Sequence, residues 1–158
     1  MKESKKGFTL IELLIVIAVI AVLAAAVFVA LNPAKRFADA RNARRQTDVQ
    51  NVLSAIKTDE VDNGGTYIAA VSGLTADLNY VIGTNAVGCN TGCTAVVTQA
   101  ACANLQGLVT EGYLGSVPFD PSSGDATFTD YYISRNTSGT ITVGTCDAEN
   151  GGDIVISR

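Results

Sequence analysis

Glu12 is a single carboxylate in an otherwise apolar run near the start of the chain. Nineteen consecutive apolar residues, Leu13–Leu31, follow it, and Phe8, Leu10 and Ile11 extend the run upstream. A charge in the hydrocarbon core of a membrane costs about 2.5–3.5 kcal/mol on insertion scales, so such residues usually have a function. Glu12 is therefore the first candidate for chemistry, and neutralisation by simple protonation is the alternative.

The four cysteines are the second group of reactive side chains: Cys89, Cys93, Cys102 and Cys146. An even number of cysteines beyond a membrane segment indicates disulfides in an oxidising compartment, and four cysteines allow three pairings. The alternative is a zinc site built from all four thiolates. Cys-x-x-x-Cys with two scattered partners fits such a site poorly.

A polar turn at residues 146–154 places four oxygen-bearing side chains around two glycines: Asp147, Glu149, Asn150 and Asp153. Oxygen ligands in a glycine-containing turn could hold calcium, but the spacing matches no EF-hand. An ordinary polar turn is the simpler interpretation. We therefore expect no cofactor, with calcium as a weak candidate.

The composition argues against catalysis and against nucleic-acid binding by the second half of the chain. There is no histidine, which removes the commonest general base, and there is no nucleophile elbow or phosphate-binding loop. Residues 58–158 carry eleven acids against two bases, a net charge of −9 that disfavours nucleic acid. A membrane-anchored enzyme is the disfavoured alternative to a structural protein.

Four segments must position these residues. A short basic segment, residues 1–7, precedes an apolar helix over residues 8–31, which is long enough to span a membrane. Positive charge before an apolar run holds that end in the cytoplasm, so the rest is expected outside. The alternatives are a simple transmembrane anchor and a secretory signal peptide cut at the small residues 23–27.

The helix is expected to continue after a break at Pro33, because proline removes a hydrogen-bond donor and restricts the preceding residue. Residues 32–63 form this amphipathic continuation. Val49, Val52, Leu53 and Ile56 follow the spacing of one buried helix face, and Asn63 with two glycines gives the stop signal.

Residues 64–158 have the composition of a small β-rich globular domain, which we call the head. Strand-like runs rich in β-branched and aromatic residues occur at 67–71, 80–83, 95–98, 131–134, 140–143 and 153–157. A short helix is expected within residues 99–115, and the last three runs favour an antiparallel meander. The predicted fold class is α+β, with the Val49–Ile56 stripe covering the sheet.

Outside the apolar run, net charge distinguishes a basic region, residues 35–57, from the acidic residues 58–158. Residues 35–57, which we call the basic collar, carry six bases against two acids, a net charge of +4. The simple interpretation is a solvated surface. In an assembly, the collar would contact acidic heads or anionic lipid.

The N-terminal residues KKGFTLIELLIVIAVIAVLAA resemble the class III signal of type IV pilins and pseudopilins. In that family a basic leader ends in glycine, and an apolar residue, Thr-Leu-Ile-Glu and a long apolar helix follow. Gly7, Phe8, Thr9 and Glu12 occupy these positions. A weaker resemblance to the pilin and pseudopilin head lies in EGYLGSVPFDPSSG followed by YYIS. Pro33 lies somewhat later than the helix-breaking residue of many family members.

The resemblance implies a pilin-like fold and a processing route. A prepilin peptidase would cleave between Gly7 and Phe8 and methylate the new amino group of Phe8. Glu12 would pair with the Phe8 amine of a neighbouring copy and set the register of assembly, with pairing to its own amine as the alternative. A segment that loosens at Pro33 during assembly is the family interpretation, and an ordinary kink is the alternative.

The implied function is that of a structural subunit of an extracellular type IV pilus. Its partners would be copies of itself, the peptidase, the assembly platform and its ATPases, and the inner or cytoplasmic membrane before assembly. The alternative is a pseudopilin or minor pilin of a type II secretion or DNA-uptake machine. We favour Cys102–Cys146 and Cys89–Cys93 as disulfides, since pilin heads often tether a late loop to the sheet. Some pseudopilins bind calcium near C-terminal loops.

Overall fold

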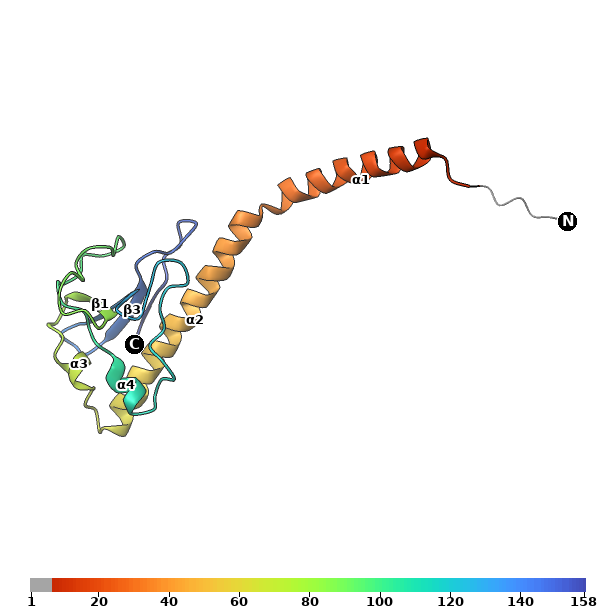
Figure 1. The fold of residues 1–158 in the computed structure, drawn as a ribbon. Coiled ribbons are helices and arrows are strands. Elements are labelled where there is room, and N and C mark those ends of the chain that lie inside the picture. The colour runs from red at the N-terminus through yellow and green to blue at the C-terminus, as the bar shows by residue number, and fades with distance from the viewer. Residues whose placement is uncertain (1–6) are drawn as a thin grey trace. The chain divides into compact units, whose positions relative to one another are not determined.

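The computed structural model describes residues 7–158 and divides the chain into two compact units, residues 1–37 and 38–158 (Figure 1). The predicted leader covers residues 1–7, so all of it except Gly7 lies outside the described residues.

The first unit consists mainly of helix α1 and also includes the first residues of α2. Helix α1 (Leu10–Leu31) has Thr9 as its N-cap, and all 22 of its residues are exposed within the chain. Asn32 ends it in the left-handed conformation (φ 41°), and α2 (Pro33–Asp62) begins at the next residue. The break predicted at Pro33 thus lies at Asn32, with proline at the first helical position, where its missing N–H costs nothing.

The second unit contains the rest of α2 from Ala38 onward. The stripe predicted to be buried is buried: Val49, Val52, Leu53 and Ile56 are at most 4% exposed. The helix ends at Asp62, and Gly64 and Gly65 follow with φ of 64° and 92°. The Gly65 amide donates to the Glu60 carbonyl at 2.7 Å, which closes the last turn.

An antiparallel sheet forms the rest of the second unit's framework. It has four strands in the order β1 (Asn79–Gly83), β2 (Phe128–Arg135), β3 (Ile141–Thr145) and β4 (Val155–Ser157). The β2–β3–β4 meander confirms the prediction made for the last three strand-like runs. The predicted α+β fold, a long helix packed on a small antiparallel sheet, is likewise confirmed.

Two local predictions of strand are wrong. Residues 67–71 form no strand, because the chain turns there into the short helix α3 (Ala69–Ser72). Residues 95–98 contribute only an isolated bridge between Thr98 and Asn79. In both cases local propensity was overridden by the packing of a loop against the sheet. The short helix expected within residues 99–115 is confirmed as α4 (Gln106–Thr110), with Gly112 just after its end.

Both faces of the sheet are covered. On one face, Tyr131 and Ile133 of β2 and Ile141 and Val143 of β3 pack in one buried cluster with the α2 stripe. On the other face, a second cluster contains four buried residues, Val81, Cys89, Tyr132 and Cys146. Residues 84–103, a loop held by disulfides, supply the cover that α2 cannot provide on this side.

The disulfide pairing differs from the expectation. Cys89 bonds to Cys102 and Cys93 bonds to Cys146, so the predicted Cys89–Cys93 and Cys102–Cys146 pairs are wrong. The loop doubles back on itself: the Cys89 amide donates to the Ala100 carbonyl at 2.9 Å. This fold brings Cys89 beside Cys102 and leaves Cys93 to reach the segment that follows β3.

The two bridges should contribute differently to stability. Cys93–Cys146 spans 53 residues and Cys89–Cys102 spans 13, so the chain-entropy relation gives about 4 and about 3 kcal/mol. We expect the Cys93→Ser/Cys146→Ser variant to lose more unfolding free energy in urea than Cys89→Ser/Cys102→Ser. Peptide mapping of the unreduced protein tests the pairing itself, and a fragment linking Cys102 to Cys146 would contradict it.

Candidate functional site

The Gly7–Phe8 peptide lies in non-helical chain directly before α1. Phe8 is 86% exposed, and a Cβ atom added at Gly7 would meet no atom of the described residues within 4 Å apart from its chain neighbours. Residues 7–158 therefore leave this bond accessible, as a proteolytic site must be. The new amino group formed by cleavage there would belong to Phe8, four residues before Glu12.

Glu12 caps the start of its own helix. Its Oε2 accepts hydrogen bonds from the Thr9 amide at 2.8 Å and the Thr9 hydroxyl at 2.7 Å. The Glu12 amide donates in return to Thr9 Oγ1 at 3.3 Å, which completes a capping box. Among residues 7–158, Glu12 Oε1 accepts no hydrogen bond, so one carboxylate oxygen is left for a further partner.

This capping box was not predicted from the sequence, although its signal was present there. Thr9 and Glu12 have the Thr-x-x-Glu spacing of the motif, and an apolar run follows them. The geometry gives Glu12 a structural role, because its carboxylate fixes the conformation of Thr9 next to the expected cleavage point.

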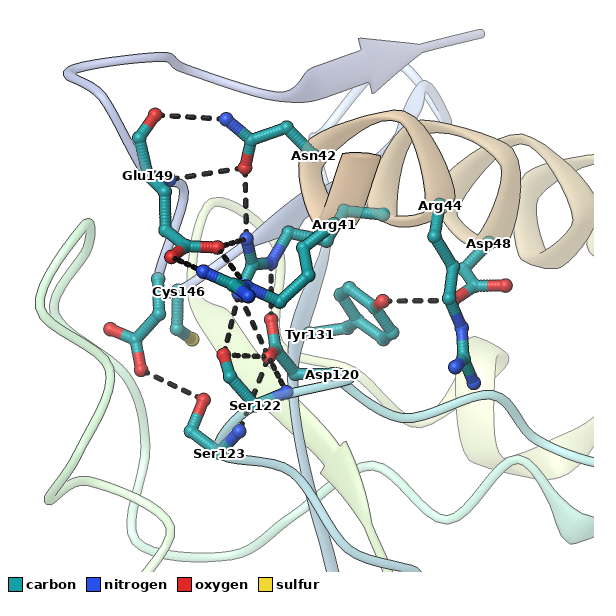
Figure 2. Close-up of polar contacts among 12 residues, drawn as sticks. Arg41, Asn42, Arg44, Asp48, Asp120, Ser122, Ser123, Tyr131, Cys146 and Glu149 are labelled. Carbon is teal, nitrogen blue, oxygen red and sulfur yellow. Dashed lines mark hydrogen bonds and ion pairs between the residues drawn. The ribbon is translucent and has the colours of Figure 1, made fainter. Parts of the chain in front are cut away.

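A second polar cluster surrounds the buried Arg45 in the head. Figure 2 labels its members Arg41, Asn42, Asp120, Ser122 and Glu149. Arg45 is 0% exposed; its Nε contacts Asp120 Oδ2 at 2.5 Å and its Nη2 contacts Asp120 Oδ1 at 2.9 Å. Its Nη1 donates to Glu149 Oε2 at 2.7 Å. Arg41 binds the same Glu149 from one turn earlier, with Nε 2.7 Å from Oε2.

Neighbouring polar groups complete this Arg45 cluster. Ser122 Oγ accepts from Arg45 Nη2 at 2.7 Å and donates to Asp120 Oδ1 at 2.8 Å. Asn42 accepts from Arg45 and from the Glu149 amide, and its own amide donates to the Glu149 carbonyl at 2.8 Å. The cluster thereby fastens the loop before β2 and the loop after β3 to the first turns of α2 in the head.

The charges of the cluster stabilise one another. Burial acts to raise the pKa of Asp120, but hydrogen bonds from Arg45 and Ser122 outweigh it and lower the pKa to about 2. Hydrogen bonds from Arg41 and then Arg45 lower the pKa of Glu149 to about 2. These charged groups are paired with one another and so hold the structure of the head.

The depressed pKa values predict that the head weakens in acid. Asp120 and Glu149 bind fewer protons in the folded than in the unfolded chain, whose reference values are 3.8 and 4.5. Their contribution is present above these reference values and is lost as the pH falls toward about 2. Burial raises the pKa of Asp130, so this residue binds more protons in the folded chain than in the unfolded chain. Its contribution to stability therefore increases as the pH falls, opposite to that of Asp120 and Glu149. We expect the unfolding temperature to fall between pH 5 and pH 2, and a flat profile would contradict this role of the two carboxylates.

The basic collar was interpreted from the sequence as a solvated surface, and this holds for only some of its cations. Arg41 and Arg45 point into the head, which was not predicted from the sequence. A signal existed, since Arg45 lies four residues before Val49 and so on the same helix face as the buried stripe.

The calcium candidates of residues 146–154 do not converge on one point. Glu149 is bound by two arginines, and Asn150 donates to Asp39 at 2.9 Å. Asp147 accepts from Ser123 at 3.2 Å. Within residues 7–158, no group of three or more His, Cys, Asp or Glu side chains is placed to hold a metal ion. Calcium binding at this turn, which also includes Asp153, stays a sequence-based prediction.

Comparison with known proteins identifies the N-terminal segment. Residues 3–28 match the family model of the prokaryotic N-terminal methylation motif. No similarity to a curated protein or to a solved structure was found. The matched segment contains Gly7, Phe8, Glu12 and most of α1, and it is the class III prepilin signal of type IV pilins and pseudopilins. The resemblance is thus confirmed, and the motif supports a type IV pilin or pseudopilin-type protein.

Proposed function

From the class III prepilin signal at residues 3–28, we propose that this chain is a structural subunit of an extracellular type IV pilus. It would be made as a single-pass membrane precursor with the head outside. A prepilin peptidase would cleave it after Gly7 and methylate the amino group of Phe8.

The two units differ in how they bury apolar side chains, and this difference supports the proposal. The head buries its own core on both faces of its sheet, whereas α1 buries none of its residues within the chain. A helix that is apolar all round requires lipid or other helices as its surroundings. Lipid would serve the precursor, and the α1 helices of neighbouring copies would serve the filament.

Glu12 would give this packing its register. Its Oε2 is occupied by Thr9, and its Oε1 would accept from the methylated Phe8 amine of an adjacent subunit. An amine and a carboxylate that are each unfavourable in an apolar bundle become tolerable as a pair, and only one axial offset brings them together.

The other expected partners follow from the same route. An assembly platform and its ATPases would extract the subunit from the membrane and add it to the filament. No catalytic role is proposed, and the net charge of −9 over residues 58–158 disfavours nucleic-acid binding by the head.

The second candidate is a pseudopilin or minor pilin of a type II secretion or DNA-uptake machine. The passage YLGSVPFDP, residues 113–121, leans slightly toward this candidate, within a stretch that resembles the heads of both pilins and pseudopilins. Its Asp120 is the carboxylate that holds Arg45.

Shearing filaments from the producing cells distinguishes the pilin from the pseudopilin function. Filaments sheared from the producing cells and washed free of membrane would contain the chain as their main protein if it is a pilin. A chain that has lost its leader yet stays with the membrane fraction would support the pseudopilin alternative. A chain with its leader intact in every fraction would contradict both.

A further inference from the structure

Four of the six cations of the basic collar are engaged within the head. Arg41 and Arg45 bind Glu149 and Asp120. Arg44 lies 3.6 Å from a carboxylate oxygen of Asp48, and Lys57 lies 2.9 Å from one of Glu60. The two remaining cations are Lys35 and Arg36. Both are exposed, and the nearest acid in the sequence, Asp39, accepts a hydrogen bond from Asn150 at 2.9 Å.

In a membrane-spanning precursor, the length of α1 determines the depth at which these two cations lie. Its 22 residues rise about 33 Å, which matches a hydrocarbon core of about 30 Å. Lys35 and Arg36 come four and five residues after Leu31, so in a membrane-spanning precursor they enter the headgroup layer.

The surroundings of the pair suit that layer. Residues 32–38 contain no acid, so the local charge is +2. Phe37 next to the pair is 65% exposed and Leu31 before it is 55% exposed, which suits an interface better than water. The first turn of α2 itself gains nothing from the two cations, because positive charge is unfavourable there.

We propose that Lys35 and Arg36 bind the phosphates of anionic phospholipids in the outward-facing leaflet and hold the precursor at a fixed depth before assembly. The arginine presents a planar fork that matches two phosphate oxygens, and the lysine adds a mobile point charge. This inference rests on the membrane-inserted precursor of the proposed function.

The test uses the full chain in vesicles, with Phe37→Trp as a reporter beside the pair. The natural sequence has no tryptophan, so this residue supplies the only indole signal. Quenching by brominated phosphatidylglycerol is compared with quenching by brominated phosphatidylcholine. One basic residue near an anionic surface gives about a five-fold preference, so we expect roughly 5- to 30-fold for the pair. The preference should fall near one in Lys35→Gln/Arg36→Gln, and it should weaken in salt.

Arg44→Gln is the matched control, since it removes an exposed cation of the same collar that already has a partner in the head. It should leave the preference unchanged. Equal quenching by both lipids, or a preference that survives Lys35→Gln/Arg36→Gln, would overturn the proposal. Resistance to carbonate extraction is measured in parallel. A chain that resists extraction but shows no lipid preference refutes only the phosphate contact, whereas a chain that is extracted refutes the membrane precursor and the inference with it.

Discussion

Replacing Glu12 by alanine is expected to abolish filament assembly while leaving cleavage after Gly7 intact. Cleavage requires an accessible peptide bond, and the Glu12 carboxylate bonds to Thr9, outside the Gly7–Phe8 bond. Assembly requires a partner for the Phe8 amine, which alanine cannot supply. Immunoblots of sheared filaments and of membranes measure both outcomes. Normal filaments from Glu12→Ala would refute the registry role.

Glu12→Gln separates the charge of Glu12 from its capping function. Glutamine at this position can still accept from the Thr9 amide, as in other capping boxes. If charge pairing drives assembly, Glu12→Gln should fail to assemble as completely as Glu12→Ala. Thr9→Val, which removes the reciprocal cap but keeps the carboxylate, should retain filaments. Assembly of Glu12→Gln together with its loss in Thr9→Val would assign the whole effect to helix capping.

Replacing Arg45 by methionine is expected to cost about 3–5 kcal/mol of unfolding free energy, because it leaves buried Asp120 without its cation. Methionine keeps much of the side-chain volume, so the loss reports mainly on charge. Urea unfolding of the full chain in detergent, followed through its tyrosines, measures the effect. A change below about 1 kcal/mol would contradict the description of the Arg45 cluster.

Two further variants control this measurement. Arg44→Met removes a cation whose side chain is 56% exposed and should change stability by no more than about 0.5 kcal/mol. Arg45→Met/Asp120→Asn removes both buried charges but keeps an oxygen for the Ser122 amide. The double variant should be more stable than Arg45→Met alone, because no uncompensated charge stays buried.

The long-range architecture was predictable from the sequence because its signals are periodic and extended. The spacing of Val49, Val52, Leu53 and Ile56 identified the helix face that covers the sheet, and the glycines after Asn63 identified where the helix ends. The strand-like runs near residues 131–157 have few residues between them, so their pairing as a meander was the simplest arrangement.

The parts that were missed depend on contacts between distant residues. Arg45 and Asp120 are 75 positions apart, and neither position reveals its partner locally. The disulfide pairing failed for the same reason, since only the folding back of residues 84–103 brings Cys89 to Cys102. The strand-like run at 95–98 was misjudged because Val96 packs on a sheet face from a loop instead of joining the ladder.

The central claim is that the chain is a prepilin processed between Gly7 and Phe8, and intact-mass analysis of the mature protein tests it most directly. The predicted mass is that of a chain that begins at Phe8, carries one methyl group on its amino terminus and contains two disulfides. Fragmentation should place the methyl group on Phe8. A mature chain that begins near Val27 would identify the apolar segment as an ordinary signal peptide and would contradict the proposed roles of Phe8 and Glu12.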